Sequence, residues 1–269
     1  MNLKVFDLGL LLYLGSIPFW LLSIKKRDFG KIAELLFFGA FIALLSGMLL
    51  RWVETYLMGF PYPPLANMYE SMVFFSWVLS LFYLFFFSRK YKEGLFGLLS
   101  SLFCSLLLLI PLLVGMDRSP RPLVPALQSY WLYIHVITCF LGYGGLGIGF
   151  LLSLIYLIGE NRESHFWPSK ETLEEGIYKA IVLGFLFLTL GIITGAAWAH
   201  YAWGRYWAWD PKETWSLITW LIYAGWLHAR LMRGWRGKRM AILSIIGFAS
   251  VIFTYVGVNY LLSGLHSYG

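Results

Sequence analysis

Apolar runs long enough to cross a lipid bilayer recur along the whole chain. A hydrocarbon core of about 30 Å takes about 20 helical residues. Eight runs of this kind are present, at 7–24, 32–53, 68–88, 95–115, 131–158, 179–198, 215–232 and 240–262. We therefore expect an all-α fold, a polytopic membrane helix bundle of about eight transmembrane helices.

The composition agrees with a membrane protein and argues against a soluble one. Hydrophobic residues make up 59% of the 269 residues and charged residues 13%, whereas soluble domains carry about 25% charged residues. A net charge of +7 raises the alternative of nucleic acid binding, but the basic residues lie in short clusters between apolar runs. We expect a lipid bilayer as partner, no nucleic acid, and one transmembrane domain spanning 1–269.

The distribution of basic residues predicts an orientation. Most of the 21 Lys and Arg residues lie near the loops after the first, third, fifth and seventh runs. Cytoplasmic loops accumulate Lys and Arg, so both termini are expected outside. The segments 54–67, 116–130 and 200–214 then also lie on the outer face.

Glycines within the apolar runs indicate how the helices pack, and the two cysteines argue against two classes of protein. Span 131–158 is rich in glycine, which lets helices approach closely in lipid. These glycines are Gly142, Gly144, Gly145, Gly147 and Gly149. Cys104 and Cys139 lie in apolar runs and belong to no CxxC or CxxCH, which argues against a thiol reductase or a c-type cytochrome.

The segment 198–215 is the most informative for function. Seven of its residues are Trp or Tyr, at Trp198, Tyr201, Trp203, Tyr206, Trp207, Trp209 and Trp215. An interfacial aromatic belt is one interpretation, since Trp and Tyr gather at headgroup depth. A platform for a large flat ligand explains the number of rings better, with Arg205 and Lys212 neutralising ligand carboxylates.

This segment resembles the tryptophan-rich WWD signature of heme-handling proteins in cytochrome c biogenesis. The stretch 203–215, Trp-Gly-Arg-Tyr-Trp-Ala-Trp-Asp-Pro-Lys-Glu-Thr-Trp, is similar to the CcsA (ResC) branch of system II. Three further segments, 64–71, 129–136 and 257–269, resemble the first outer loop, a histidine-bearing helix entry and the closing segment of that family.

The resemblance implies a cytochrome c synthase, a heme lyase that delivers heme b to the outer face and attaches it to the CxxCH thiols of apocytochrome c. It implies partners of the CcsB (ResB) type and thiol-reducing proteins. The expected location is the bacterial inner (cytoplasmic) membrane, or the thylakoid membrane in a plastid. The external tryptophan-rich loop, 199–215, would face the periplasm or lumen.

Two histidines lie at the predicted outer ends of their spans. His135 lies about one turn inside span 131–158, and His266 follows span 240–262 after Gly264. A membrane histidine is often a hydrogen-bonded packing residue, but ionisable groups at this depth also mark functional sites. The resemblance implies that both are catalytic and are the axial ligands of an outer heme iron.

His228 is expected at a second, inner site. It lies 13 residues beyond Trp215, about 20 Å deeper at a helical rise of about 1.5 Å. Ala224 and Gly225 leave a notch of small residues beside it. The resemblance implies that His228 binds the inner heme iron and that the partner protein supplies the second ligand. We expect His200 to be a loop residue.

The resemblance also implies the set of cofactor-binding residues. It consists of His135, His228, His266, Trp198, Trp203, Arg205, Tyr206, Trp207, Trp209, Asp210, Lys212 and Trp215. Asp210 and Glu213 either orient the loop or guide the substrate peptide. One alternative function is a heme exporter that serves a chaperone without ligation. Another is a b-type membrane electron carrier, which needs paired histidines within the bilayer.

Overall fold

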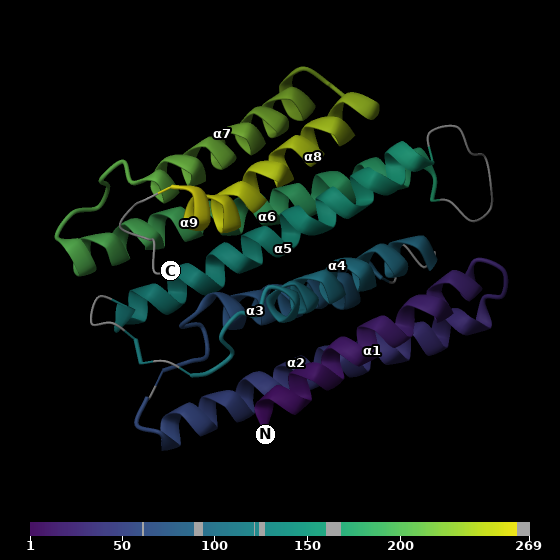
Figure 1. Cartoon of the computed structure of the whole chain (residues 1–269). Helices are drawn as coiled ribbons and strands as arrows, with labels where there is room; N and C mark the ends of the chain where they lie inside the picture. The colour runs from purple at the N-terminus through teal and green to yellow at the C-terminus, as the bar shows by residue number, and fades with distance from the viewer. Residues whose placement is uncertain (61, 89–93, 121, 124–126, 160–167, 263–269) are drawn as a thin grey trace. The chain divides into compact units, whose positions relative to one another are not determined.

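The computed structural model describes residues 1–60, 62–88, 94–120, 122–123, 127–159 and 168–262. Within these ranges all regular structure is helical (Figure 1), as predicted. The helices are α1 (Asn2–Ser23), α2 (Asp28–Leu57), α3 (Met68–Phe82), η1 (Tyr83–Phe87), α4 (Gly94–Leu113), α5 (Tyr130–Ile158), α6 (Lys170–Trp203), α7 (Pro211–Met232), α8 (Lys238–Ile252), η3 (Phe253–Gly257) and α9 (Val258–Leu261).

Seven helices in the described part of the chain are long and apolar enough to span a membrane, with α3 and η1 counted together and α8, η3 and α9 likewise. The predicted span 215–232 is helical, as α7, but is not among these seven. Lys212 and Glu213 in its first turn and Arg230 in its last turn lower its apolar character.

The boundaries of α6 differ most from the prediction of 179–198. Its N-terminus extends back to Lys170, where the Ser169 hydroxyl caps it by accepting a hydrogen bond from the Thr172 amide. Its C-terminus extends to Trp203, and Gly204 ends it with a φ of 74°, where glycine is favoured. The connection between α6 and α7 is therefore shorter than the predicted loop 199–215.

The helices pack into two units, one built from α1 to α4 and the other from α5 to α9. In the first unit α1 and α2 lie side by side (Figure 1), with Gly9 against Leu44 and Gly47 against Phe6. Small residues at such positions allow the close approach that drives helix association in lipid.

A buried ion pair ties the first unit together at one end. The Arg51 Nε atom donates to Glu70 Oε1 at 2.7 Å, and these side chains are 1% and 4% exposed. Arg51 Nη1 also donates to the Arg118 carbonyl oxygen at 2.8 Å. Glu70 Oε2 accepts from the Ala66 amide at 2.7 Å. The pair therefore connects α2 and α3 with the segments that precede α3 and follow α4.

Arg118 extends this network with its own side chain. Its Nη2 atom donates to Asp7 Oδ1 at 2.6 Å and to the Tyr69 hydroxyl at 3.2 Å. Burial lowers the pKa of the guanidinium, but the bonds to Tyr69 and Asp7 outweigh burial and raise the pKa overall. Arg118 therefore stays charged and holds the start of α1 to α3.

In the second unit, α5 and α6 pack backbone against backbone. A methyl group on Gly142 would lie 2.8 Å from the Leu188 amide nitrogen, and one on Gly145 would lie 2.8 Å from the Gly184 Cα atom. Side chains larger than hydrogen would separate the helices here. The predicted close approach of a glycine-rich helix is confirmed, and its partner is α6. This contact sets the register that places the site residues below.

Candidate heme site

Backbone capping fixes the loop between α6 and α7. Asp210 is the N-cap of α7, and its side chain accepts from the Lys212 amide at 3.0 Å. Glu213 reaches back, and its Oε2 atom accepts from the amides of Ala208 and Asp210 at 2.7 and 3.2 Å. This is a capping box, which satisfies the amides that a helix start leaves without partners.

The carboxylates of Asp210 and Glu213 both bond to the loop and the start of α7, and the alternative role of guiding the substrate peptide stays a prediction. Both are buried, and their carboxylates accept hydrogen bonds from loop and helix amides. They orient the loop. The residue between Ala208 and Asp210, Trp209, has a φ of 58°, a region that bulky side chains seldom occupy. Strained backbone that is held by surrounding bonds often marks functional segments.

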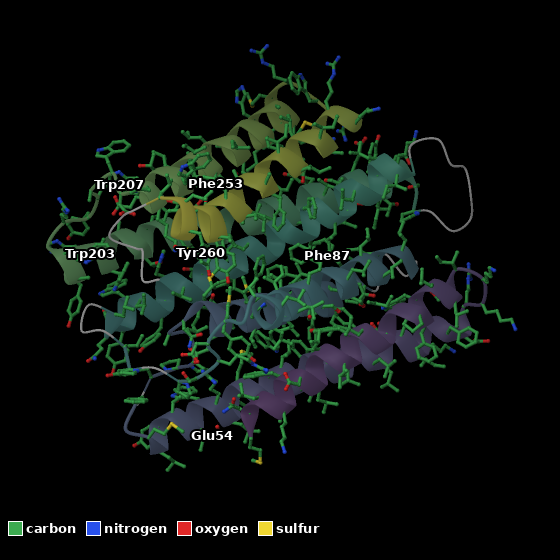
Figure 2. All side chains as sticks on the ribbon, in the orientation of Figure 1. Glu54, Phe87, Trp203, Trp207, Phe253 and Tyr260 are labelled. Carbon is green, nitrogen blue, oxygen red and sulfur yellow. The ribbon has the colours of Figure 1, made fainter. Side chains whose placement is uncertain are left out.

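The aromatic side chains of the segment divide into a buried and an exposed group. Trp198 is 2% exposed, whereas Tyr206 and Trp209 are 60% and 69% exposed. Between them, the rings of Trp198 and Trp203 meet edge to face at 4.8 Å, and those of Trp207 and Trp209 at 5.8 Å. Figure 2 shows Trp203 at the end of α6 and Trp207 on the loop that follows. The exposed rings offer faces to a flat ligand.

His135 lies on α5 in a cradle formed by α6. Its Nδ1 atom is 2.8 Å from the Gly191 carbonyl oxygen. Its ring lies nearly parallel to the Trp198 indole, with an interplanar angle of 7° and centroids 6.1 Å apart. A methyl group on Gly195 would lie 2.7 Å from the His135 Nδ1 and Cε1 atoms. Three residues of α6 therefore define where the imidazole lies.

The Gly191 contact also selects a tautomer. A carbonyl oxygen accepts hydrogen bonds only, so the neutral His135 ring carries its hydrogen on Nδ1. The lone pair is then on Nε2, one of the two nitrogens through which imidazole binds metals, and a carbonyl partner on the other nitrogen is the usual support for such a ligand. The Trp198 ring, which stacks on His135, also contacts the ring of Trp203 at the end of α6, next to the loop.

The two cations of the segment have different environments. Arg205 is exposed on the loop. Lys212, in the first turn of α7, is half-buried, and its Nζ atom donates to Asn259 Oδ1 on α9 at 2.8 Å. Sequence reasoning predicted that both face ligand carboxylates; Arg205 has the exposure for that role, and Lys212 is held against α9.

The start of α7 also packs on η3, the turn before α9. The Trp215 and Phe253 rings lie 4.2 Å apart. Thr254 lies 3.1 Å from the Thr219 hydroxyl and donates to the Trp215 carbonyl oxygen at 3.2 Å. Trp215 is therefore a packing residue between α7 and η3 as well as the last ring of the segment.

His200 lies in the last turn of α6. It is exposed near the end of α6, and its ring stacks on Tyr206 with centroids 4.2 Å apart and an interplanar angle of 7°. The prediction that His200 is a loop residue is wrong, because α6 continues through it to Trp203. His165 and His266 lie outside the described residues, so the pairing of His135 with His266 stays a prediction.

His228 lies toward the other end of α7. Its side chain is exposed, and the space beside Gly225 is open, with nothing within 4 Å of where a methyl group would lie. The neighbouring Trp226 is buried and donates to the Met240 carbonyl oxygen on α8. Arg230, in the last turn of α7, pairs with Glu174 near the start of α6. His228 is therefore exposed on α7, next to the predicted notch.

Sequence reasoning missed Gly191, Gly195 and Asn259. A signal for the glycines was present, because Gly184, Gly191 and Gly195 recur at helical spacing and so share one face of α6. Among the described residues, no group of three or more His, Cys, Asp or Glu side chains gathers as a metal site. Heme brings four ring nitrogens and takes axial ligands from protein, so single histidines suit it.

Comparison with known proteins identifies the family. The family described as Cytochrome C assembly protein matches residues 65–266. Cytochrome c biogenesis protein CcsA of Prochlorococcus marinus is 36% identical, over 98% of this chain and 92% of its own length. The proteins of the same name from Guillardia theta and Trieres chinensis are 40% and 38% identical, each over 97% of this chain and over 93% and 94% of their own lengths. The chain therefore belongs to the cytochrome c assembly family, among its CcsA proteins.

Proposed function

We propose that this chain holds heme b beside the loop between α6 and α7 and presents it for covalent attachment to apocytochrome c. Family membership supports a role in cytochrome c biogenesis. Heme binding, its delivery to the outer face and the lyase activity are the proposal. The seven helices able to span a membrane and the CcsA relatives support an integral membrane protein. We place it in the bacterial cytoplasmic membrane or the thylakoid membrane, with the loop outside.

The observation that carries the proposal is the cradle of His135. Its imidazole is oriented by the Gly191 carbonyl oxygen and backed by Trp198, which leads through Trp203 to a loop with exposed aromatic faces. A packing histidine needs a hydrogen bond but does not need an aromatic surface beside it. A neighbouring aromatic surface suits an axial heme ligand, because the porphyrin extends sideways from the iron and stacks on aromatic rings.

The other predicted residues take roles that fit their exposure. Trp207, Trp209 and Tyr206 would stack on the porphyrin and select which vinyl group faces which thiol. Arg205 would pair with a heme propionate from its exposed position, while Lys212 would do so only by giving up its bond to Asn259. Asp210 would contribute through the capping box rather than by direct contact.

His135 and His266 would hold the iron from opposite faces. One of them leaves when the histidine of the CxxCH peptide binds. Each cysteine thiol then adds across a vinyl group, so that a carbon–sulfur bond forms, the thiol hydrogen passes to the other vinyl carbon and no electrons are transferred overall. Both nucleophiles come from the substrate, kept reduced by thiol-reducing proteins. The contribution of this chain is positioning, which supplies a large share of many rate enhancements.

The exposure of His228 supports a second heme position that is completed by another chain. Because the His228 side chain is exposed, a second imidazole on the same iron would come from a partner protein. A CcsB (ResB) type membrane protein is the proposed partner. The open space beside Gly225 leaves room for the edge of a flat ring.

The test is co-expression of the chain with its partner and an apocytochrome c. We expect His135→Ala with His266→Ala to abolish covalent heme on a denaturing gel while the chain itself still accumulates. The purified complex should show the absorption spectrum of heme with two axial imidazoles, and each single substitution should remove it when it is made together with His228→Ala, which empties the proposed inner site. Undiminished holocytochrome c in the double variant would exclude both residues from the mechanism.

A further inference from the structure

The turn that joins α7 to α8 (Figure 1) carries a concentration of positive charge. Residues 230–239 include no acidic residue and five basic ones, namely Arg230, Arg233, Arg236, Lys238 and Arg239. The helical segment from Lys238 to Leu261 is long and apolar enough to span a membrane. Because a membrane-spanning helix starts there, the turn lies at the depth of the lipid headgroups.

One carboxylate on α6 holds the shape of this turn. Glu174 Oε1 accepts from the Gly237 amide at 2.9 Å, and Glu174 Oε2 accepts from Arg230 Nη1 at 3.1 Å. Gly237 has a φ of 71°, where glycine is favoured, and a methyl group on it would lie 3.3 Å from the Tyr156 hydroxyl oxygen. The turn is therefore held by α6 and lies close to α5, so that its backbone is ordered before a ligand binds.

The same carboxylate leaves three arginines with little or no pairing. Arg236 lies 3.9 Å from Glu174, at the limit of an ion pair, and its side chain is 68% exposed. Arg233 and Arg239 are exposed and pair with no carboxylate in the part of the chain that the structure describes. Helix α8 has no acidic residue in its first turn, so the positive end of its dipole adds to the field of these side chains.

The side chains of the turn indicate the kind of ligand. A guanidinium group binds a phosphate through two parallel hydrogen bonds, whereas an ammonium acts as a point charge. Trp235 is 41% exposed and lies beside Arg239, whose guanidinium carbon is 5.9 Å from the indole centroid. Tryptophan gathers at headgroup depth, and basic clusters next to membrane helices bind anionic lipids. Together these groups match a lipid whose headgroup carries a phosphate and a net negative charge.

We propose that Arg233, Arg236 and Arg239 bind the headgroup of an anionic phospholipid of the phosphatidylglycerol type. A solvated face is the alternative, but a solvated turn needs neither the bonds from Glu174 nor an exposed indole beside a guanidinium. Groups that are already ordered lose less entropy on binding. The site lies at the other end of α7 from the aromatic loop and involves no heme, so it stands or falls independently of the proposed function.

The turn between α1 and α2 provides a comparison within the same chain. It carries Lys25, Lys26 and Arg27, which are all exposed, and Asp28 follows directly. Two of its three cations are lysines, and residues 24–27 contain no tryptophan. We therefore expect this turn to lack a specific lipid site and to serve as the matched control.

The experiment titrates the purified chain in detergent micelles with phosphatidylglycerol and follows thermal unfolding. A ligand of the folded state raises the unfolding temperature, so we expect a rise with phosphatidylglycerol and none with equal concentrations of phosphatidylcholine or inorganic phosphate. A basic residue at a membrane surface contributes roughly five-fold to affinity. Arg233→Gln with Arg239→Gln should therefore need about 25-fold more phosphatidylglycerol for the same rise. Lys25→Gln with Lys26→Gln removes the same charge elsewhere and should behave as wild type.

Four results would overturn the proposal. An equal rise with phosphatidylcholine would show that the net charge of the headgroup is not recognised, and an equal rise with inorganic phosphate would show a site for a free anion. A wild-type response of the arginine variant, or an equal loss in the lysine variant, would show that these arginines form no specific site. If the double arginine variant does not accumulate, Arg233→Gln alone is judged by the same criteria, with an expected loss of roughly five-fold.

Discussion

A methyl group at Gly195 tests the cradle of His135 directly. In Gly195→Ala the added carbon would lie 2.7 Å from both Nδ1 and Cε1 of the imidazole. Carbon atoms pack at about 3.5 to 4.0 Å, so the ring must retreat by about 1 Å. The backbone of α6 offers little room to absorb this movement, because Gly184 packs against α5 backbone.

A shift of that size has two consequences for the imidazole. The contact between Nδ1 and the Gly191 oxygen, 2.8 Å in the structure, lengthens beyond the limit of a hydrogen bond, and the ring loses its support. Nε2 moves with the ring relative to the loop. Misplacement by about 1 Å costs on the order of 100-fold in rate for positioned groups. We therefore expect holocytochrome c formation to fall about 100-fold and the paired-imidazole spectrum of the outer heme to be lost.

The assay compares covalent heme per unit of membrane-inserted protein. Alanine stabilises a helix interior relative to glycine by roughly 0.5 to 1 kcal/mol, so the variant should still accumulate. Gly15→Ala in α1, where nothing lies within 4 Å of the new carbon, is the matched control and should behave as wild type. Normal heme attachment and a normal spectrum in Gly195→Ala would refute the argument that α6 sets the position of His135.

Three further predictions concern other parts of the molecule. Glu70→Ala should destabilise the first unit by about 3 to 5 kcal/mol because it leaves Arg51 buried without its partner, whereas Arg51→Met with Glu70→Leu should recover most of the loss in thermal unfolding; equal losses in the two proteins would contradict this. Gly225→Ile should fill the space beside His228, so that a flat ligand no longer fits without strain, and should lower the heme retained at the inner site roughly ten-fold while the spectrum of the outer heme stays unchanged. Unchanged heme content would contradict the proposal that a ring edge occupies this space. Asp210→Ala removes a helix cap worth about 1 kcal/mol, so protease cleavage between α6 and α7 should quicken about five-fold in limited proteolysis, and an unchanged rate would show that the cap does not hold the loop.

The helices could be predicted from the sequence because a membrane helix needs a run of about 20 apolar residues, which is visible in the sequence. Each apolar run predicted a helix, and each was confirmed in the described residues. The ends were less predictable where polar side chains continue the helix. Lys170 to Tyr178 lie outside the predicted span 179–198, yet they form the first turns of α6, capped by Ser169. Hydropathy marks the part of a helix that lipid can cover, and a helix continues wherever its backbone bonds are satisfied.

The contacts within the site could not be predicted from the sequence, because they depend on how neighbouring helices are aligned with one another. His135 and Trp198 were both predicted site residues, but their parallel stacking results from the register between α5 and α6. That register is set by which glycines meet, Gly142 on Leu188 and Gly145 on Gly184, and periodicity along one helix does not specify it. Lys212 illustrates the same limit. The predicted span began at 215, so Lys212 read as a loop cation; because α7 starts at Pro211, the side chain is in the first turn and points at α9.

Helix α7 relates the two proposed heme positions. Its first turn carries the capping box that holds the aromatic loop, and its exposed His228 is 13 residues beyond Trp215, about 20 Å along a helix. The two sites therefore use separate groups: rings, Gly191 and the His135 cradle at one end, and an exposed imidazole with an open notch at the other. The separation of Trp215 and His228 along α7 is about ten times a metal–imidazole bond of about 2 Å, so an iron bound by His228 would not lie beside the first turn of α7. On the proposed function, delivery thus requires that the inner ligands release the iron before the outer pair binds it, and the exposure of His228 makes the partner protein the natural controller of that release.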